Sequence, residues 1–201
     1  MMRLRFPHVA LCVVIAGAFA VPTGCASPDA KETVDSMGDF GLQVARVKDS
    51  VDNTIKALEV VVASQPGDIN TNVASYSKAV AALDKQARVV RERATEMKAK
   101  GDEFFKEWEA PKGMTPERRA ELTASYGKIK ADMTTAKEEF TPFLAASKDI
   151  QNYLKLDPSV KGIGSMGELV NKAKENGARV KASIDAVLTQ VNSVRGMMST
   201  K

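Results

Sequence analysis

The sequence predicts an all-α protein, an elongated antiparallel four-helix bundle that resembles a coiled-coil rod. Four segments carry apolar residues at alternating spacings of three and four, the pattern of a single buried helix face. Segments rich in Pro and Gly separate them, and short connections favour antiparallel neighbours. The second segment, residues 73–108, would form a helix about 50–60 Å long. Its apolar face therefore needs other helices of similar length to cover it.

Residues 1–24 have the features of an export signal. Arg3 and Arg5 supply the positive charge, and the apolar run over residues 9–21 is too short to span a membrane. The following Gly24-Cys25 resembles the end of a bacterial lipobox, which implies that Cys25 is lipidated, although Pro22 stands where that motif prefers Leu. The alternative is a plain secretory signal, which leaves an odd free thiol in an oxidising compartment.

The residue after the predicted lipidation site bears on location. Ala26 stands where an Asp would retain a bacterial lipoprotein in the inner membrane. The lipobox resemblance therefore implies the periplasmic face of the outer membrane, with the lipid as the membrane anchor.

Removal of the signal would also remove His8 and Cys12, so that the mature chain has no histidine and one cysteine. Catalytic sites that need His, and zinc or di-iron sites built on His or Cys, are then excluded within one chain. The mature chain would keep 27 basic and 25 acidic residues, a net charge of +2. We expect no catalytic residues, no cofactor, no metal site and no nucleic-acid partner, since basic residues and aromatics do not cluster together.

The first helix is predicted to begin near Ser27-Pro28-Asp29, a cap followed by Pro and an acid. Residues 25–41 are expected to form a membrane-proximal segment and the start of this helix, because Gly38 and Gly41 weaken it, and residues 42–201 to form the bundle. A turn at Gln65-Pro66-Gly67-Asp68 ends the helix. The positions on its buried face are Met37, Phe40, Val44, Val47, Val51, Thr54, Leu58 and Val61.

The second helix ends in an aromatic cluster, Phe104, Phe105 and Trp108. Phe104 and Trp108 continue the apolar face, so the cluster is expected to be the packed end of the bundle or part of a partner patch. The positions on the buried face are Val73, Tyr76, Val80, Leu83, Ala87, Val90, Ala94, Met97, Gly101, Phe104 and Trp108.

The third helix is predicted to open at Thr115-Pro116-Glu117 and to kink or break near Phe140, because Pro142 removes a backbone hydrogen bond. Pro142 is the fourth residue of the candidate partner patch. The positions on the buried face are Leu122, Tyr126, Ile129, Met133, Ala136, Phe140, Phe143, Ser147, Ile150 and Leu154.

A longer connection precedes the fourth helix, which Ser165 and Glu168 would open as a capping box. The positions on its buried face are Val170, Ala173, Gly177, Val180, Ile184, Val187, Val191, Val194 and Met198. The small residues on the four faces would allow helices to approach closely; they are Ala87, Ala94, Gly101, Ala136, Ala173 and Gly177.

Parts of the sequence resemble a family of bacterial lipoproteins known as domain of unknown function 2959. The resembling elements are residues 46–49, Tyr76, residues 91–93, Phe105 to Glu109, Pro142-Phe143-Leu144, Lys148-Asp149-Ile150 and Leu154-Lys155-Leu156. They cover nearly all of the mature chain, but Leu156 and Asp157 stand where the family tends to have Asn and His. The resemblance implies a helical envelope protein and assigns no catalytic residue.

We therefore expect a non-enzymatic envelope lipoprotein, a lipid-anchored rod that serves as a periplasmic spacer or as a docking surface for a protein partner. A lipid or membrane-surface binding protein is one alternative. An enzyme that uses only carboxylates, lysines and tyrosine is another, which a pocket with convergent carboxylates would favour. Lys201 leaves open a structural lipoprotein joined to the cell wall, and the narrow apolar faces leave open a homodimer.

Overall fold

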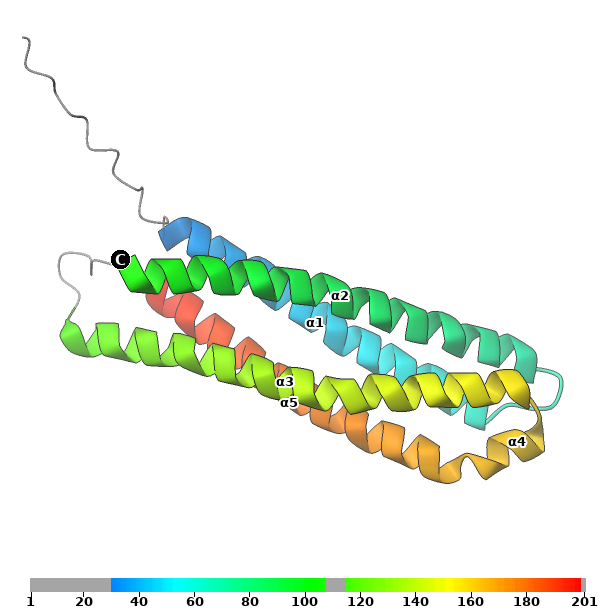
Figure 1. Cartoon of the computed structure of the whole chain (residues 1–201). Coiled ribbons are helices and arrows are strands. Elements are labelled where there is room, and N and C mark those ends of the chain that lie inside the picture. Colours follow the sequence, from blue (N-terminus) through cyan, green and yellow to red (C-terminus); the bar gives the residue numbers. More distant parts are fainter. Residues whose placement is uncertain (1–29, 108–114, 200–201) are drawn as a thin grey trace, which may run out of the picture.

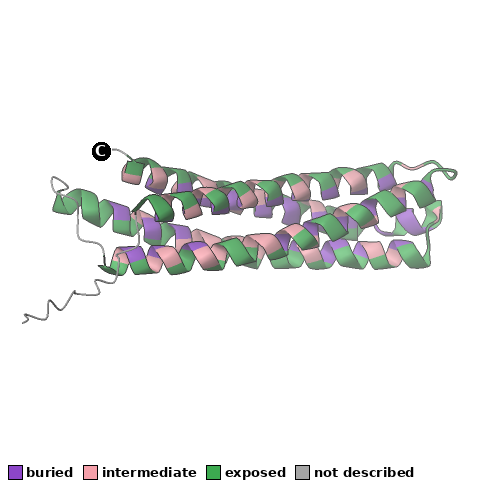
Figure 2. Ribbon diagram, turned by 90° about the horizontal axis from the view of Figure 1, so that it is seen from above, coloured by how far each residue is buried: buried purple, intermediate pink, exposed green. Residues whose placement is uncertain are grey.

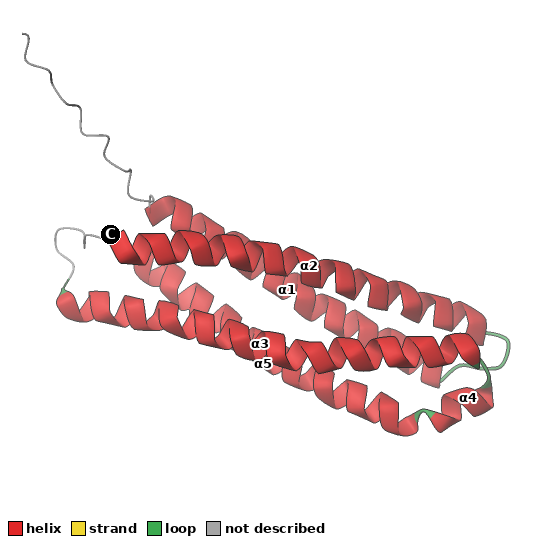
Figure 3. Cartoon of the chain, in the orientation of Figure 1, coloured by secondary structure: helices red, strands yellow, loops and turns green. Residues whose placement is uncertain are grey.

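The four long helices run antiparallel along one rod in the computed structural model, which describes residues 30–107 and 115–199. The helices are α1 (Ala30–Val62), α2 (Ile69–Glu107), α3 (Pro116–Leu156), the short α4 (Val160–Ser165) and α5 (Gly167–Ser199). The described ranges contain no strand, as Figure 3 also shows. The predicted all-α antiparallel bundle is confirmed.

Helices α1 and α2 form one closely packed pair, and α3 and α5 form the other. Helix α1 also packs along α5, whereas α2 and α3 form the smallest interface between neighbouring long helices. In Figure 1 the blue start of α1 and the red end of α5 lie at one end of the rod, and α4 lies at the other. At 39 residues, α2 is about 60 Å long.

Most of the predicted buried positions form the core. The predicted positions in the described ranges that are only half-buried are Val90, Ala94, Met133, Ala136, Phe140 and Met198. Figure 2 shows the buried residues as stripes along the helices. Every predicted position in α1 is buried, including Thr54, whose hydroxyl donates to Ser50 O at 2.8 Å. The core has two parts, one toward the end with the termini, around Met97 and Ile129, and one near α4, around Leu58 and Leu154.

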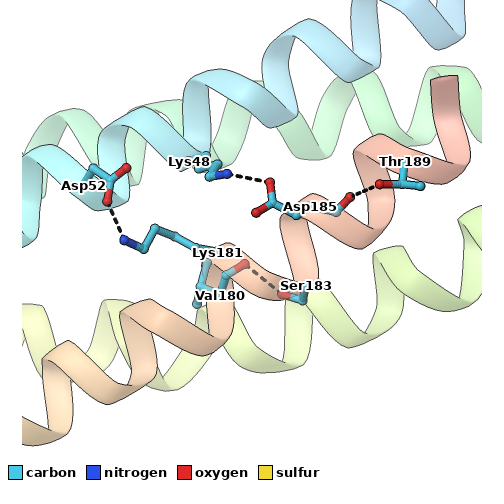
Figure 4. Close-up of polar contacts among 7 residues, drawn as sticks. All are labelled: Lys48, Asp52, Val180, Lys181, Ser183, Asp185 and Thr189. Carbon is cyan, nitrogen blue, oxygen red and sulfur yellow. Dashed lines mark hydrogen bonds and ion pairs between the residues drawn. The ribbon is translucent and has the colours of Figure 1, made fainter.

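Three ion pairs align α1 with α5. Lys48 Nζ lies 2.6 Å from Asp185 Oδ1, and Lys181 Nζ lies 2.7 Å from Asp52 Oδ1 (Figure 4). The third pair, Lys174 with Glu59, has a separation of 2.8 Å. Steps of four and seven residues forward in α1 match equal steps backward in α5, so the pairs share one antiparallel heptad register.

Two glycines allow close approach, as the sequence predicts. A Cβ atom at Gly177 would lie 2.5 Å from Ile55 Cδ1, and one at Gly101 would overlap the ring of Tyr126. At both interfaces the backbone of one helix therefore packs against a side chain of the other, and an added methyl group would require Ile55 or Tyr126 to shift.

Helix α1 is not divided near its start. It is continuous through Gly38 and Gly41, and Thr33, Met37 and Phe40 are already buried. The described bundle therefore includes residues before 42. Burial against α5 outweighs the low helix propensity of glycine, since Gly41 faces Val191.

Helix α3 does not break at Pro142. It is continuous from Pro116 to Leu156, and Figure 1 shows only a gentle change of direction near its middle. The ring of Pro142 faces solvent, where the lost backbone hydrogen bond leaves a carbonyl that water can reach.

The connection before α5 differs from the prediction. The six-residue helix α4 occupies part of it, capped by Ser159, whose hydroxyl accepts from Gly162 N at 3.0 Å. Ser165 does not form the predicted capping box, because its hydroxyl donates to Gly162 O at 2.7 Å. Helix α5 begins at Gly167, where Val170 N donates to Met166 O.

Candidate functional site

A deep groove lies between α2 and α3 in the middle of the rod. We call it the α2–α3 groove; its volume is about 400 Å³. Its floor comes from buried residues of the far helices, among them Val44 and Val47 of α1 and Ile184 and Val187 of α5. Its walls are the half-buried residues Val90, Ala94, Met133, Ala136 and Phe140.

The entrance of the groove is cationic. Arg91, Thr95, Lys137 and Thr141 line it, and all four are exposed. Thr95 donates to Arg91 O at 3.0 Å, and Thr141 donates to Lys137 O at 2.9 Å. Both threonine hydroxyls therefore donate within their own helices. The side-chain donors left for a ligand at the entrance are the guanidinium of Arg91 and the ammonium of Lys137.

Ion pairs flank this entrance on both sides. Lys148 Nζ lies 3.0 Å from Asp84 Oδ1 toward the α4 end, and Lys130 Nζ lies 2.9 Å from Asp102 Oδ1 toward the other end. Each pair joins α2 to α3. The two pairs have the same antiparallel register, since Asp102 follows Asp84 by as many residues as Lys130 precedes Lys148.

Within that register the intervening positions bring Arg91 opposite Thr141 and Thr95 opposite Lys137. A threonine thus stands where an acidic residue would complete each pair. In the described part of the chain, neither Arg91 nor Lys137 forms an ion pair. The groove therefore opens where the interface between α2 and α3 lacks negative charge.

A second surface lies at the α4 end of the rod. Six large hydrophobic residues are exposed in the described ranges, and five of them lie at this end. We call these five the apolar tip; they are Val60, Val62, Leu156, Val160 and Leu169. Leu156 is 87% exposed and Val160 is 56% exposed. The sixth, Leu42, lies in the first half of α1. Exposed apolar residues that gather at one end of a molecule are typical of interaction sites.

Tyr126 forms a polar cluster near the other end. Its hydroxyl lies 3.0 Å from Asp102 Oδ1 and 3.1 Å from Lys98 O, which share its one proton. Burial and the charge of Asp102 raise the pKa of Tyr126, so the phenol stays protonated at neutral pH. The cluster therefore joins α2 to α3 as a hydrogen-bond donor and does not supply a general base.

The three described residues of the predicted partner patch, Phe104, Phe105 and Pro142, do not come together. Phe104 is buried in the core, and the ring of Phe105 stacks on Tyr126 with centroids 4.5 Å apart. Pro142 is exposed 16 residues beyond Tyr126 on α3, which is about 24 Å. Trp108 lies outside the described residues. So do the predicted lipidation site Cys25, the signal over residues 1–24, and Lys201.

Sequence reasoning did not find the groove or the apolar tip. Ala94 and Ala136 were expected to permit close approach, but they line the groove instead. Two features of the sequence could have indicated the groove. They are the small residues on facing helices and the threonines at positions 95 and 141, which interrupt the charge pattern.

No helix in the described ranges is both long enough and apolar enough to cross a membrane. Across those same residues, His, Cys, Asp and Glu do not gather in groups of three or more that could hold a metal ion. No acidic side chain lines the α2–α3 groove. The described residues thus offer apolar and cationic surface, and no convergent carboxylates.

A family of proteins matches most of the chain. The family described as protein of unknown function (DUF2959) matches residues 34–197. No curated protein and no solved structure matches the chain. The matched range begins within α1 and ends within α5, so it includes the whole groove and the whole apolar tip.

Proposed function

The chain belongs to the DUF2959 family of proteins of unknown function, and from this premise we propose that it is a non-enzymatic bacterial envelope lipoprotein. In this proposal Cys25 carries the lipid that holds the chain on the periplasmic face of the outer membrane. The helical rod then acts as a spacer that carries a docking surface for a periplasmic protein.

The position of the apolar tip is the observation that supports this proposal. Helix α1 begins at Ala30, five residues after the predicted lipidation site in the sequence, and is 33 residues long. Val60 and Val62 lie at the far end of α1, and Leu156 ends α3 at the same end of the rod. A lipid at Cys25 would therefore leave the apolar tip about 50 Å from the anchored end.

The chemistry of the apolar tip favours a protein partner. Exposed Val and Leu side chains offer apolar surface whose burial is favourable, and the buried centre of a protein interface is more apolar than the rest of a protein surface. The remaining surface mixes both charge signs, with ion pairs such as Lys31–Asp35 and Arg93–Glu96 on it. This mixture does not favour broad binding to an anionic bilayer.

Site-specific photocrosslinking in intact envelopes tests this proposal. A photoreactive amino acid at Leu156 should give a discrete adduct with one protein, and the same amino acid at Leu42 should not, although Leu42 is 52% exposed. The adduct should weaken when Val160→Lys is added, and it should be lost in a Cys25→Ala chain. Equal adducts at Leu156 and Leu42, or none at either, would contradict docking at the tip. Adducts with lipid alone would favour the membrane-binding alternative.

A further inference from the structure

The α2–α3 groove combines an apolar interior with a cationic entrance, and we propose that it binds a fatty acid of about twelve carbons. The acyl chain lies in the interior, and the carboxylate lies at the entrance between Arg91 and Lys137. This binding activity goes beyond the proposed docking function and does not depend on it.

The depth of the groove favours an acyl chain. The groove passes between α2 and α3 and reaches Val47 of α1 and Ile184 of α5, so an inserted chain is surrounded by all four long helices. Its volume of about 400 Å³ falls in the range of small-ligand sites. A partner helix, about 10 Å across, would have to separate α2 from α3 to reach the same floor.

The ends of the groove limit the ligand further. The Asp84–Lys148 pair bridges α2 and α3 on one side, and the Asp102–Lys130 pair bridges them on the other. These bridges cross the interface on both sides of the groove and mark the two ends of the open stretch. The groove therefore opens to solvent between these bridges, beside Arg91 and Lys137.

The charge of the entrance selects the headgroup. Arg91 and Lys137 have no ion-pair partner among the described residues, and no acidic residue lines the groove to repel an anion. A carboxylate can accept two parallel hydrogen bonds from a guanidinium and one from an ammonium. The fatty acid thus supplies the negative charge that Thr95 and Thr141 do not.

Displacement of a fluorescent fatty acid measures this binding. The full chain with Cys25→Ala, which has no lipidation site, is mixed with 11-(dansylamino)undecanoic acid, whose emission shifts to the blue in an apolar site. Competitors of equal chain length, each below its micelle-forming concentration, are dodecanoate and dodecyltrimethylammonium. We expect dodecanoate to displace the probe at least tenfold better. Each methylene removed should weaken displacement about two- to fourfold.

Two kinds of variant separate the entrance from the interior. The Arg91→Gln/Lys137→Gln double variant should lose at least tenfold in affinity for dodecanoate and lose the preference for it. Its matched control is Lys85→Gln/Lys128→Gln, which removes two exposed cations from the same helices outside the groove. Ala94→Phe should fill the interior and abolish probe binding, with helix content checked by circular dichroism.

The inference is overturned by any of three results. These are no probe binding by the folded chain, equal displacement by the ammonium amphiphile, or unchanged dodecanoate affinity in the double variant. If Ala94→Phe does not fold, the double variant still decides, because it changes only exposed side chains. The crosslinking test uses other residues, so either proposal can fail without the other.

Discussion

The ring of Tyr126 lies directly over Gly101, where α3 crosses α2. Its hydroxyl is held by Lys98 O and Asp102, and its ring stacks on Phe105. The ring therefore has no freedom to move aside, so Gly101 keeps α2 and α3 in contact at this level.

Gly101→Ala should lower the free energy of unfolding by about 1–3 kcal/mol, because the added methyl overlaps the tyrosine ring. Alanine normally stabilises a helix by about 1 kcal/mol relative to glycine, so the sign is diagnostic. Gly127→Ala is the matched control, since open space surrounds the Cβ position of residue 127. This variant should raise the free energy of unfolding by about 0.5–1 kcal/mol. Urea unfolding followed by circular dichroism measures both. A stabilised Gly101→Ala would show that the helices are farther apart.

Tyr76→Phe should change stability in a pH-dependent way. Tyr76 is fully buried and donates to Ser147 O at 3.0 Å, and burial raises its pKa. A raised tyrosine pKa gives stability that is complete below the unfolded-state value of about 10 and is lost as pH rises above it. The free energy of unfolding of the variant should be about 1 kcal/mol lower at pH 7, and it should decline less steeply above pH 10 than that of the unaltered chain. Urea unfolding between pH 7 and 11 measures this difference.

Lysine ion pairs are also lost at alkaline pH, in every variant. Tyr153→Phe is therefore the control, because it removes a tyrosine hydroxyl and leaves the buried Tyr76 in place. Its decline should match that of the unaltered chain. Equal slopes in all three chains would contradict a buried, protonated Tyr76.

Reversing one charge between α1 and α5 should test their register. Lys181→Asp places two carboxylates together and should lower the free energy of unfolding by about 0.5–1 kcal/mol. The swapped chain, Asp52→Lys/Lys181→Asp, should recover most of this loss, and salt should reduce both effects. A double-mutant cycle with no recovery would mean that Asp52 and Lys181 are not neighbours.

Ala136→Leu should leave the free energy of unfolding unchanged or raise it by up to about 1 kcal/mol, because the introduced leucine side chain extends into the α2–α3 groove. Ala173→Leu is the matched control in the filled part of the core and should lose about 1–3 kcal/mol. Thermal and urea unfolding compare the two. Similar losses at both positions would mean that the groove is closed in solution.

Pro142→Ala should raise the free energy of unfolding by about 1–3 kcal/mol, since it restores a backbone hydrogen bond within a continuous helix. Pro158→Ala, in the connection between α3 and α4, restores no helical bond and should give no gain. Urea unfolding with both variants checks the contrast. A loss at position 142 would give Pro142 a stabilising role that its exposed ring does not explain.

The helices could be predicted because burial follows spacing, and residues such as Val51, Leu83 and Val180 occupy the positions that spacing assigns. The groove could not be predicted, because a small residue on a buried face can either let two helices approach or leave a space between them. Gly101 and Gly177 bring helices together, whereas Ala94 and Ala136 leave space between them. Which of these occurs depends on the side chains of the facing helices, and the spacing of residues along one helix gives no information about them. Helix α4 was missed because six residues are too short for a periodic pattern.

The placement of Ala30 and Leu156 at opposite ends of the rod determines how the molecule responds to a force applied between them. Ala30 begins α1 at one end, whereas Leu156 ends α3 at the other. A pull between these two residues runs parallel to the helix axes, so it loads the packed faces in shear. Core contacts and ion pairs between α1 and α5 then resist together, instead of opening one after another as in a zipper.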